Sequence, residues 1–146
     1  MQKVTTFLWF DNQAEEAAKF YTSLFKNSKI TRTSSLTTEF TLDGIEYIAL
    51  NGGPIYKFNE SVSLYVTCED QTEVDELWDK LLADGGKESQ CGWLKDKYGL
   101  SWQIIPKILP KLIGSSDRTK ADRAMQAMLK MVKIDCAALQ KAYDGE

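Results

Sequence analysis

The sequence predicts the same order of elements, strand–helix–strand–strand–strand, twice along the chain, and this repeat constrains the fold more than any other feature. In the first copy, β-branched and aromatic runs and one helical period predict elements at residues 4–10, 13–26, 30–36, 38–42 and 45–50. In the second copy, the same signals predict a strand at 62–67, a helix between Asp70 and Gly85, and strands at 87–90 and within 91–106. Neither copy can bury both faces of its sheet alone, so we expect an α+β fold of two βαβββ modules.

The two copies align residue by residue. A shift of 58 residues pairs Val4 with Val62, Phe7 with Tyr65 and Asn12 with Asp70, and a shift of 55 pairs Gly44 with Gly99 and Tyr47 with Trp102. Asn12 and Asp70 stand at expected N-caps, and a glutamate follows each three residues later. We therefore predict a single domain over 1–146, with a first module at 1–54, a second at 61–107 and a helical tail at 108–146.

The tail has a helical period of its own. Apolar residues recur at helical spacing after Ser116 or Asp117, and Asp135 precedes a second run that ends at Gly145. Methionines on these runs are typical of adaptable core packing. We expect a helical pair that packs on the sheet or on a partner chain.

The hairpin at 91–106 is the most aromatic part of the second copy. Trp93 lies in its first strand and Trp102 in its second, and Gly99 ends the tight turn between them. Because strand side chains alternate, Gln103 faces away from Trp102. A hairpin of this composition is either a core element or the wall of a pocket.

Composition excludes several classes of function. The chain has 146 residues, 43% of them hydrophobic and 27% charged, with a net charge of −3. The charges are mixed along the chain, so nucleic acid is not an expected partner. No apolar run approaches the roughly 20 residues of a membrane span, and no signal-like segment opens the chain, so we expect a cytoplasmic protein that does not bind membranes.

The chain contains no histidine, which removes the commonest transition-metal ligand and the usual general base near neutral pH. The cysteines at 68, 91 and 136 are odd in number and widely spaced, so the sequence predicts neither a disulfide framework nor a zinc knuckle. Any chemistry must use carboxylates, amides, hydroxyls, thiols or indoles.

Five segments together resemble one protein family: LWFD (8–11), AEEAAKFY (14–21), ALNGGP (49–54), QCGWLKDKYG (90–99) and SWQ (101–103). They are similar to the PhnB-like proteins, often labelled 3-demethylubiquinone-9 3-methyltransferase-like, within the vicinal oxygen chelate superfamily of glyoxalase I and bleomycin-resistance proteins. The resemblance extends over nearly the whole chain, tail included. It implies two βαβββ modules that curl around a ligand cavity, usually in a homodimer.

The resemblance also permits a test of the superfamily's metal site. Metal-dependent relatives hold a divalent ion with histidine and glutamate side chains, and their last-strand glutamate corresponds to Gln103 here. The repeat-related position is Ile48, and the first-strand positions fall near Thr5 and Ser63. None is a strong ligand, so we expect no metal. No glycine-rich turn between a strand and a helix supports an adenosyl cofactor, so we expect no cofactor and treat the methyltransferase label as a name.

The candidate ligand-binding residues are aromatic or amide side chains: Trp9, Asn51, Trp93, Trp102 and Gln103. Indoles could line a slot for a small apolar or aromatic ligand, with Gln103 and Asn51 as polar anchors. For each tryptophan the alternative is core packing, and for Asn51 it is turn chemistry. We therefore predict a metal-independent small-molecule-binding protein. The alternatives are a superfamily enzyme (isomerase, dioxygenase or group transferase, with unknown catalytic residues) and a dimerisation scaffold without a ligand.

Overall fold

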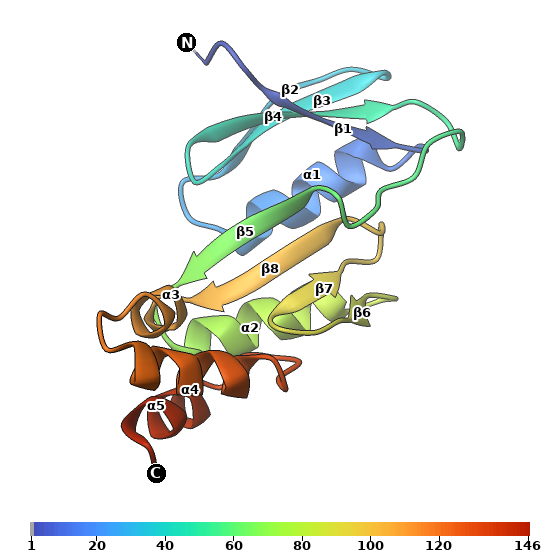
Figure 1. Ribbon diagram of the computed structural model, residues 1–146. Helices are drawn as coiled ribbons and strands as arrows, with labels where there is room; N and C mark the ends of the chain where they lie inside the picture. Colours follow the sequence, from blue (N-terminus) through green and yellow to red (C-terminus); the bar gives the residue numbers. More distant parts are fainter. Residues whose placement is uncertain (1) are drawn as a thin grey trace. The chain divides into compact units, whose positions relative to one another are not determined.

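The computed structural model describes residues 2–146, which form two compact units that divide between Phe58 and Asn59 (Figure 1). Unit 1 holds the first predicted module, and unit 2 holds the second module together with the tail. The division falls in the irregular segment between β4 and β5. No helix within the described residues is long and apolar enough to cross a membrane.

Unit 1 is a four-stranded sheet with one helix on it. Its elements are β1 (Thr6–Phe10), α1 (Ala14–Leu24), β2 (Lys29–Thr33), β3 (Thr37–Leu42) and β4 (Ile45–Asn51). The strand order is β1-β4-β3-β2, with β1 parallel to β4 and the other pairs antiparallel. The core lies between the sheet and α1 and includes Leu8, Phe10, Tyr21, Phe40 and Ala49.

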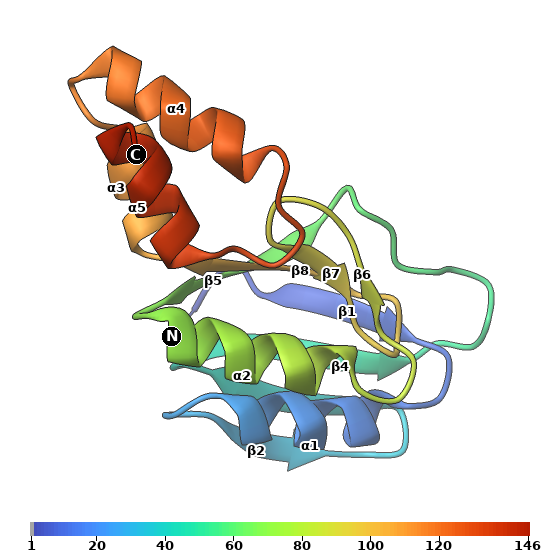
Figure 2. The same cartoon turned by 90° about the horizontal axis from the view of Figure 1, so that it is seen from below.

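Unit 2 repeats this arrangement and adds three helices. Its elements are β5 (Ser63–Cys68), α2 (Gln71–Leu82), β6 (Lys87–Glu88), β7 (Trp93–Lys95), β8 (Ser101–Pro106), α3 (Ile108–Ile113), α4 (Arg118–Met128) and α5 (Cys136–Asp144). The order β5-β8-β7-β6 matches that of unit 1 (Figure 2). The α+β fold of two βαβββ modules is therefore confirmed.

The predicted repeat holds at the level of strand register. Phe7 lies opposite Ile48 in unit 1, and Tyr65 lies opposite Gln103 in unit 2. These pairs are related by the same shifts of 58 and 55 residues that align the sequence. Because a slip of one residue would turn every side chain to the other face, this agreement means that equivalent residues of the two modules face the same way.

The two module helices begin differently. Asp70 caps α2 as predicted: its Oδ1 accepts from the N–H of Glu73 at 3.0 Å, and the Glu73 carboxylate accepts from the N–H of Glu69 at 2.7 Å. The prediction of Asn12 as the cap of α1 is wrong. The N-cap is Gln13, which makes no side-chain capping bond, and the N–H of Ala14 donates instead to Oδ1 of Asn51 at 2.9 Å.

The tail packs on unit 2 through an apolar cluster on the face of the sheet opposite α2. Its buried members are Ile105, Leu109, Leu112, Ala124, Ile134 and Leu139. The N–H groups of Cys91 and Gly92 donate to the carbonyls of Met131 and Val132, both at 2.8 Å. The tail is thereby fastened to the hairpin 91–106 by backbone bonds as well as by packing.

The helix α3 is an element that the sequence did not predict. Pro110 lies in its first turn, where the missing N–H has no intrahelical partner to lose, so proline is compatible with the helix there. The predicted starts of the other tail helices are confirmed. Asp117 accepts from the N–H of Lys120 at 3.1 Å, and Asp135 accepts from that of Ala138 at 3.0 Å.

Candidate functional site

A row of three side chains crosses the face of the unit 2 sheet opposite α2. Gln103 on β8 lies between Tyr65 on β5 and Trp93 on β7, because both are its cross-strand partners. Tyr65 is 53% exposed, and Trp93 and Gln103 are half-buried. The row therefore presents one amide with one aromatic side chain on each side of it.

The amide of Gln103 is only partly used within the protein. Its Nε2 donates to Oγ of Ser63 at 3.0 Å, and no residue among 2–146 is found donating to its Oε1. The neighbouring Ser101 hydroxyl is buried and has no hydrogen-bond partner in the described chain. Unsatisfied polar groups of this kind are costly in a folded protein and are common where a ligand or water completes the bonding.

The row is flanked by an ion pair. Lys95, the cross-strand partner of Ser101, pairs with the carboxylate of Glu60. The hydrogen bond from Lys95 is the main cause that lowers the pKa of Glu60 below its usual value. The opposite charges of Lys95 and Glu60 offset each other, so this exposed ion pair gives the row no strong net charge.

Trp102 lies on the other face of the sheet, in the core beneath α2. It is 1% exposed, and its Nε1 donates to Oδ2 of Asp96 at 2.9 Å. Asp96 is itself buried, and its Oδ1 accepts from the N–H groups of Tyr98 and Leu100 at 2.9 and 3.1 Å. The carboxylate thus joins the turn to the indole.

This role of Asp96 went unnoticed in the sequence. The signal was present, since aspartate at the first position of a turn that ends in Gly99 is typical of side-chain-to-backbone capping. Gly99 adopts the positive φ expected of it, +88°. The hairpin is therefore a core element on its α2 side and a candidate wall of a site on the opposite side.

The two predicted residues of unit 1 hold the segment after β4. The indole N–H of Trp9 donates to the carbonyl of Gly53 at 2.9 Å, and the ring meets Tyr56 edge-on at 4.9 Å. Asn51 accepts from Ala14 and donates through Nδ2 to the carbonyl of Ser35 at 3.1 Å. Both side chains thus have structural partners inside unit 1.

Gly52 has a packing reason to be glycine. A Cβ built there would lie 2.3 Å from the ring of Trp9. This close contact accounts for the glycine pair without a phosphate-binding loop, in agreement with the absence of a following helix.

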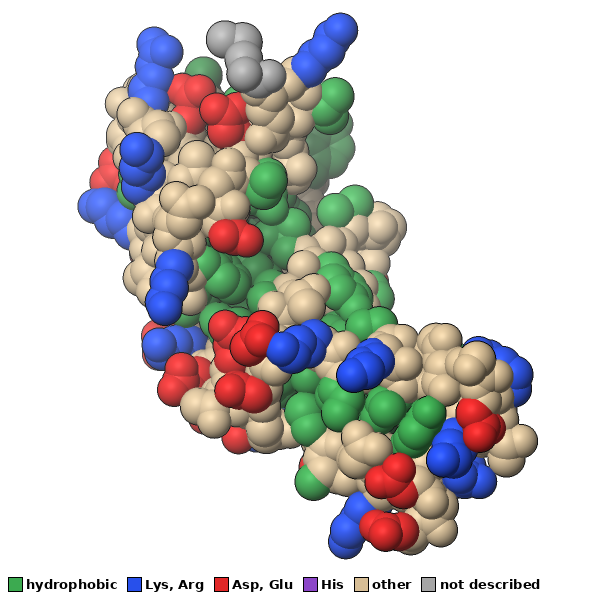
Figure 3. Space-filling view, turned by 90° about the vertical axis from the view of Figure 1, so that its left-hand side faces the viewer, with side chains coloured by type: hydrophobic (Ala, Val, Ile, Leu, Met, Phe, Trp, Pro, Cys, Tyr) green, Lys and Arg blue, Asp and Glu red, His purple; other side chains and the backbone are tan. Residues whose placement is uncertain are grey.

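Of the five predicted residues, the structure brings Trp93 and Gln103 side by side. It places Trp102 on the opposite face, and Trp9 and Asn51 within unit 1. Across residues 2–146, no group of three or more histidine, cysteine, aspartate and glutamate side chains is arranged to hold a metal ion. On the face drawn in Figure 3, basic and acidic side chains are intermixed, with hydrophobic side chains exposed between them.

Comparison with known proteins gives one family match. The model of the family described as 3-demethylubiquinone-9 3-methyltransferase matches residues 2–105. The PhnB protein of Bacillus cereus, whose description carries the same methyltransferase label, is 38% identical, with a TM-score of 0.63 over 72% of this chain and 99% of its own. No curated protein matches the chain.

More distant structures share the fold. A glyoxalase-related enzyme from Fulvimarina pelagi is 15% identical, with a TM-score of 0.53 over 74% of this chain and 91% of its own. The fosfomycin resistance protein FosX from Listeria monocytogenes is 14% identical, with a TM-score of 0.54 over 73% and 93%. At these identities the likeness concerns the fold alone.

The family match stops at residue 105, near the end of β8, so it does not include the tail helices. That the resemblance extends through the tail stays a prediction. The chain belongs to the PhnB-like family described as 3-demethylubiquinone-9 3-methyltransferase.

Proposed function

We propose that the protein binds a small planar organic molecule, without a metal, on the face of the unit 2 sheet opposite α2. The observation that carries this proposal is the row of Tyr65, Gln103 and Trp93, with the amide between the two aromatic side chains. Aromatic side chains offer large apolar contact area, and the amide offers both a donor and an acceptor.

The chemistry of the row favours an organic ligand over a cation. By the family resemblance, Gln103 corresponds to the metal-binding glutamate of metal-dependent vicinal oxygen chelate proteins, and a neutral amide binds hard or borderline cations poorly. The Oε1 atom, by contrast, is suited to accept a hydrogen bond from a ligand hydroxyl or N–H.

Nuclear magnetic resonance can test this proposal with internal controls, because the chain has four tryptophans in different surroundings. In a titration with 2-naphthol, a planar aromatic alcohol, we expect the indole N–H signal of Trp93 and the amide signals of Gln103 to shift. The signals of Trp78, on the buried face of α2, and of Trp102, in the core beneath that helix, should stay in place. The proposal fails if millimolar 2-naphthol leaves Trp93 and Gln103 unchanged.

A matched pair of variants separates the amide from the surrounding sheet. Gln103→Leu removes the polar anchor and should weaken 2-naphthol binding about tenfold, the effect of one hydrogen bond of ordinary strength. Gln90→Leu changes an exposed glutamine of the same hairpin and should bind as the unchanged protein does. Native mass spectrometry of protein fresh from cells would then identify any retained molecule, and a stoichiometric divalent ion in that spectrum would contradict metal-independent binding.

We also propose a homodimer, as the family resemblance implies. Several large hydrophobic side chains of unit 1 are exposed, notably Val4 at 85%, Phe7 at 54% and Ile45 at 53%. Exposed apolar groups of this size are typical of association surfaces when they lie together. Light scattering at micromolar concentration should give twice the 16.5 kDa chain mass, and Phe7→Ser should lower it. A monomeric mass for the unchanged protein would contradict the dimer.

A further inference from the structure

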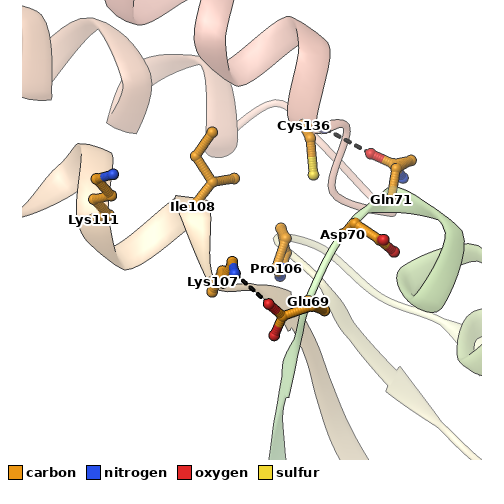
Figure 4. A pocket seen from close by; sticks show the side chains of 8 residues that line it. All are labelled: Glu69, Asp70, Gln71, Pro106, Lys107, Ile108, Lys111 and Cys136. Carbon is orange, nitrogen blue, oxygen red and sulfur yellow. Dashed lines mark hydrogen bonds and ion pairs between the residues drawn. The ribbon is translucent and has the colours of Figure 1, made fainter.

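A pocket of about 490 Å³ lies in unit 2, where the tail meets the ends of β5 and β8 (Figure 4). One wall comes from the segment between β5 and α2, and the opposite wall from the start of α3 and of α5. Its lining residues are Glu69, Asp70, Gln71, Pro106, Lys107, Ile108, Lys111 and Cys136. Because α3 and α5 belong to the tail, part of this pocket lies outside the residues that the family model matches.

The interior of the pocket is apolar. Pro106 lies between the two walls, and Ile108 packs against the apolar cluster of the tail. Cys136 projects its sulfur toward Pro106 (Figure 4). Burial, followed by the neighbouring carboxylates of Asp135 and Asp70, raises the pKa of the Cys136 thiol, which keeps it neutral near pH 7. The volume is within the range of roughly 300–1,000 Å³ that is typical of small-molecule sites.

The polar wall is held in place by Gln71. Its Nε2 donates to Oδ1 of Asp75 at 2.9 Å and to the carbonyl of Ile134 at 3.0 Å, and its Oε1 accepts from the N–H of Cys136 at 2.8 Å. One side chain on α2 thus fixes the start of α5. Gln71 has its hydrogen bonds filled, so it shapes the pocket and does not anchor a ligand.

The rim of the pocket carries two carboxylates, Glu69 and Asp70, and two lysines, Lys107 and Lys111. Lys111 makes no ion pair within residues 2–146. Lys107 pairs with Glu69, and the two side chains are 58% and 73% exposed. Exposed pairs of this kind contribute little stability and exchange readily. The remaining carboxylate, Asp70, is the N-cap of α2 and accepts a hydrogen bond from the N–H of Glu73.

We propose that this pocket binds a small amphipathic anion, whose apolar body fills the space beside Pro106, Ile108 and Cys136 and whose carboxylate or sulfonate meets Lys111 and Lys107. The site is separate from the row of Tyr65, Gln103 and Trp93. Part of its lining, including Lys111 and Cys136, lies outside the residues that the family model matches.

Fluorescence titration with 1-anilinonaphthalene-8-sulfonate, an aromatic sulfonate, tests the charge at the rim. We expect Lys111→Ala to weaken binding about tenfold, because a charge-assisted contact is lost. Lys130→Ala, which removes an exposed lysine elsewhere in the tail, should leave binding unchanged. Equal dissociation constants for these two variants would overturn the proposal. Lys111→Ala should leave the 2-naphthol shifts of Trp93 and Gln103 as they are in the unchanged protein, so failure here is distinguishable from failure of the proposed function.

Protection of Cys136 from alkylation locates the ligand independently of dye fluorescence. In a Cys91→Ser background, Cys136 is the accessible thiol, because Cys68 is fully buried. We expect octanoate to slow the maleimide reaction of Cys136 severalfold, and 1-octanol at the same concentration to slow it less. If octanoate does not change the rate at which maleimide reacts with Cys136, the proposed site is wrong. If octanoate and 1-octanol protect Cys136 equally, the proposed preference for anions is wrong. Circular dichroism of each variant confirms that it is folded.

Discussion

The two modules have the same backbone plan and use it differently. Phe7 opposite Ile48 and Tyr65 opposite Gln103 occupy matching places in register. In unit 1 this pair is apolar. The next residue across the sheet is Glu39, whose Oε2 lies 3.8 Å from Nε of Arg32. In unit 2 it carries an amide between aromatic side chains. The comparison shows that hydrophobic pattern and turns specify the repeat, while the face opposite each helix is free to diverge.

The end of each module shows the same divergence. The N–H of Gly52 donates to the carbonyl of Phe10, and the N–H of Lys107 donates to the carbonyl of Cys68, both at 2.8 Å. These bonds are equivalent under the shifts of 58 and 55 residues. Position 52 must be glycine because Trp9 lies against it, whereas the residue equivalent to Trp9 is Thr67, which is smaller. The second module can therefore carry a lysine at that point and continue into α3.

The largest expected difference between the modules concerns Tyr47 and Trp102, which are equivalent in the repeat. Trp102→Ala should lower the free energy of unfolding by about 3–5 kcal/mol, because it empties a fully buried site and leaves Asp96 without its indole partner. Tyr47 stacks on Phe40 at 5.5 Å but is only partly buried, so Tyr47→Ala should cost roughly 2 kcal/mol. Urea unfolding followed by circular dichroism measures both, and equal losses would contradict the assignment of Trp102 to the core.

The contact between Gly52 and Trp9 is tested by a double-mutant cycle. Gly52→Ala should cost about 1–3 kcal/mol, because the added Cβ overlaps the indole. In a Trp9→Thr background, which copies the second module, the same change should cost almost nothing, and the difference is the coupling energy. Gly53→Ala serves as the control: its φ is +91° and no atom lies within 4 Å of the added Cβ, so its cost should be the same in both backgrounds.

The displaced helix cap gives a third comparison. Asn51→Ala and Asp70→Ala should each lower the free energy of unfolding by about 1 kcal/mol, because each removes the side-chain partner of a helix N-terminus. Asn12→Ala, at the position equivalent to Asp70, should change it by a few tenths of a kcal/mol at most. Urea unfolding measures the free energies, and hydrogen exchange at Ala14 reports the α1 cap directly. A large effect of Asn12→Ala would restore Asn12 as the cap.

The capping error shows which part of the fold was predictable from the sequence. Strands, helices and register follow from short-range periodicity, so the βαβββ repeat was predicted with ends accurate to a few residues. The Asn51 cap depends on a contact between residues 37 positions apart, which no local pattern encodes. The sequence identified asparagine with two glycines and predicted a turn, and the structure adds its long-range role.

The site was predictable to a similar depth. Alternation along β8 separates Gln103 from Trp102, so the sequence did indicate that the two could not share one face. What it could not decide was which face the core occupies, because both faces carry large side chains. The pocket beside Cys136 was not foreseen, since it depends on how α3 and α5 pack, and α3 was not recognised in a segment that contains Pro110.

The smallest expected effect concerns the tail, which has no counterpart in unit 1. Asp75 on α2 and Lys133 before α5 form an ion pair at 2.9 Å. The hydrogen bond from Gln71, and then Lys133, lowers the pKa of Asp75, and the hydrogen bond to Asp75 raises the pKa of Lys133. The contribution of Asp75 to the stability of the fold is thus present at neutral pH and is lost as pH falls through the lowered pKa of its carboxyl group. The contribution of Lys133 to stability is lost as pH rises through the raised pKa of its ammonium group.

Asp75→Asn should therefore lower the free energy of unfolding by about 0.5 kcal/mol at pH 7, the size expected for a pair that solvent screens. The difference from the unchanged protein should shrink as pH falls through the lowered pKa of Asp75, because the carboxylate then becomes protonated in the folded as well as the unfolded chain. Glu15→Gln, which removes the exposed 3.0 Å pair with Lys19 inside α1, provides a control without contact to the tail. Hydrogen exchange at Cys136 should accelerate in Asp75→Asn and not in Glu15→Gln, because only the first loosens the junction between α2 and α5.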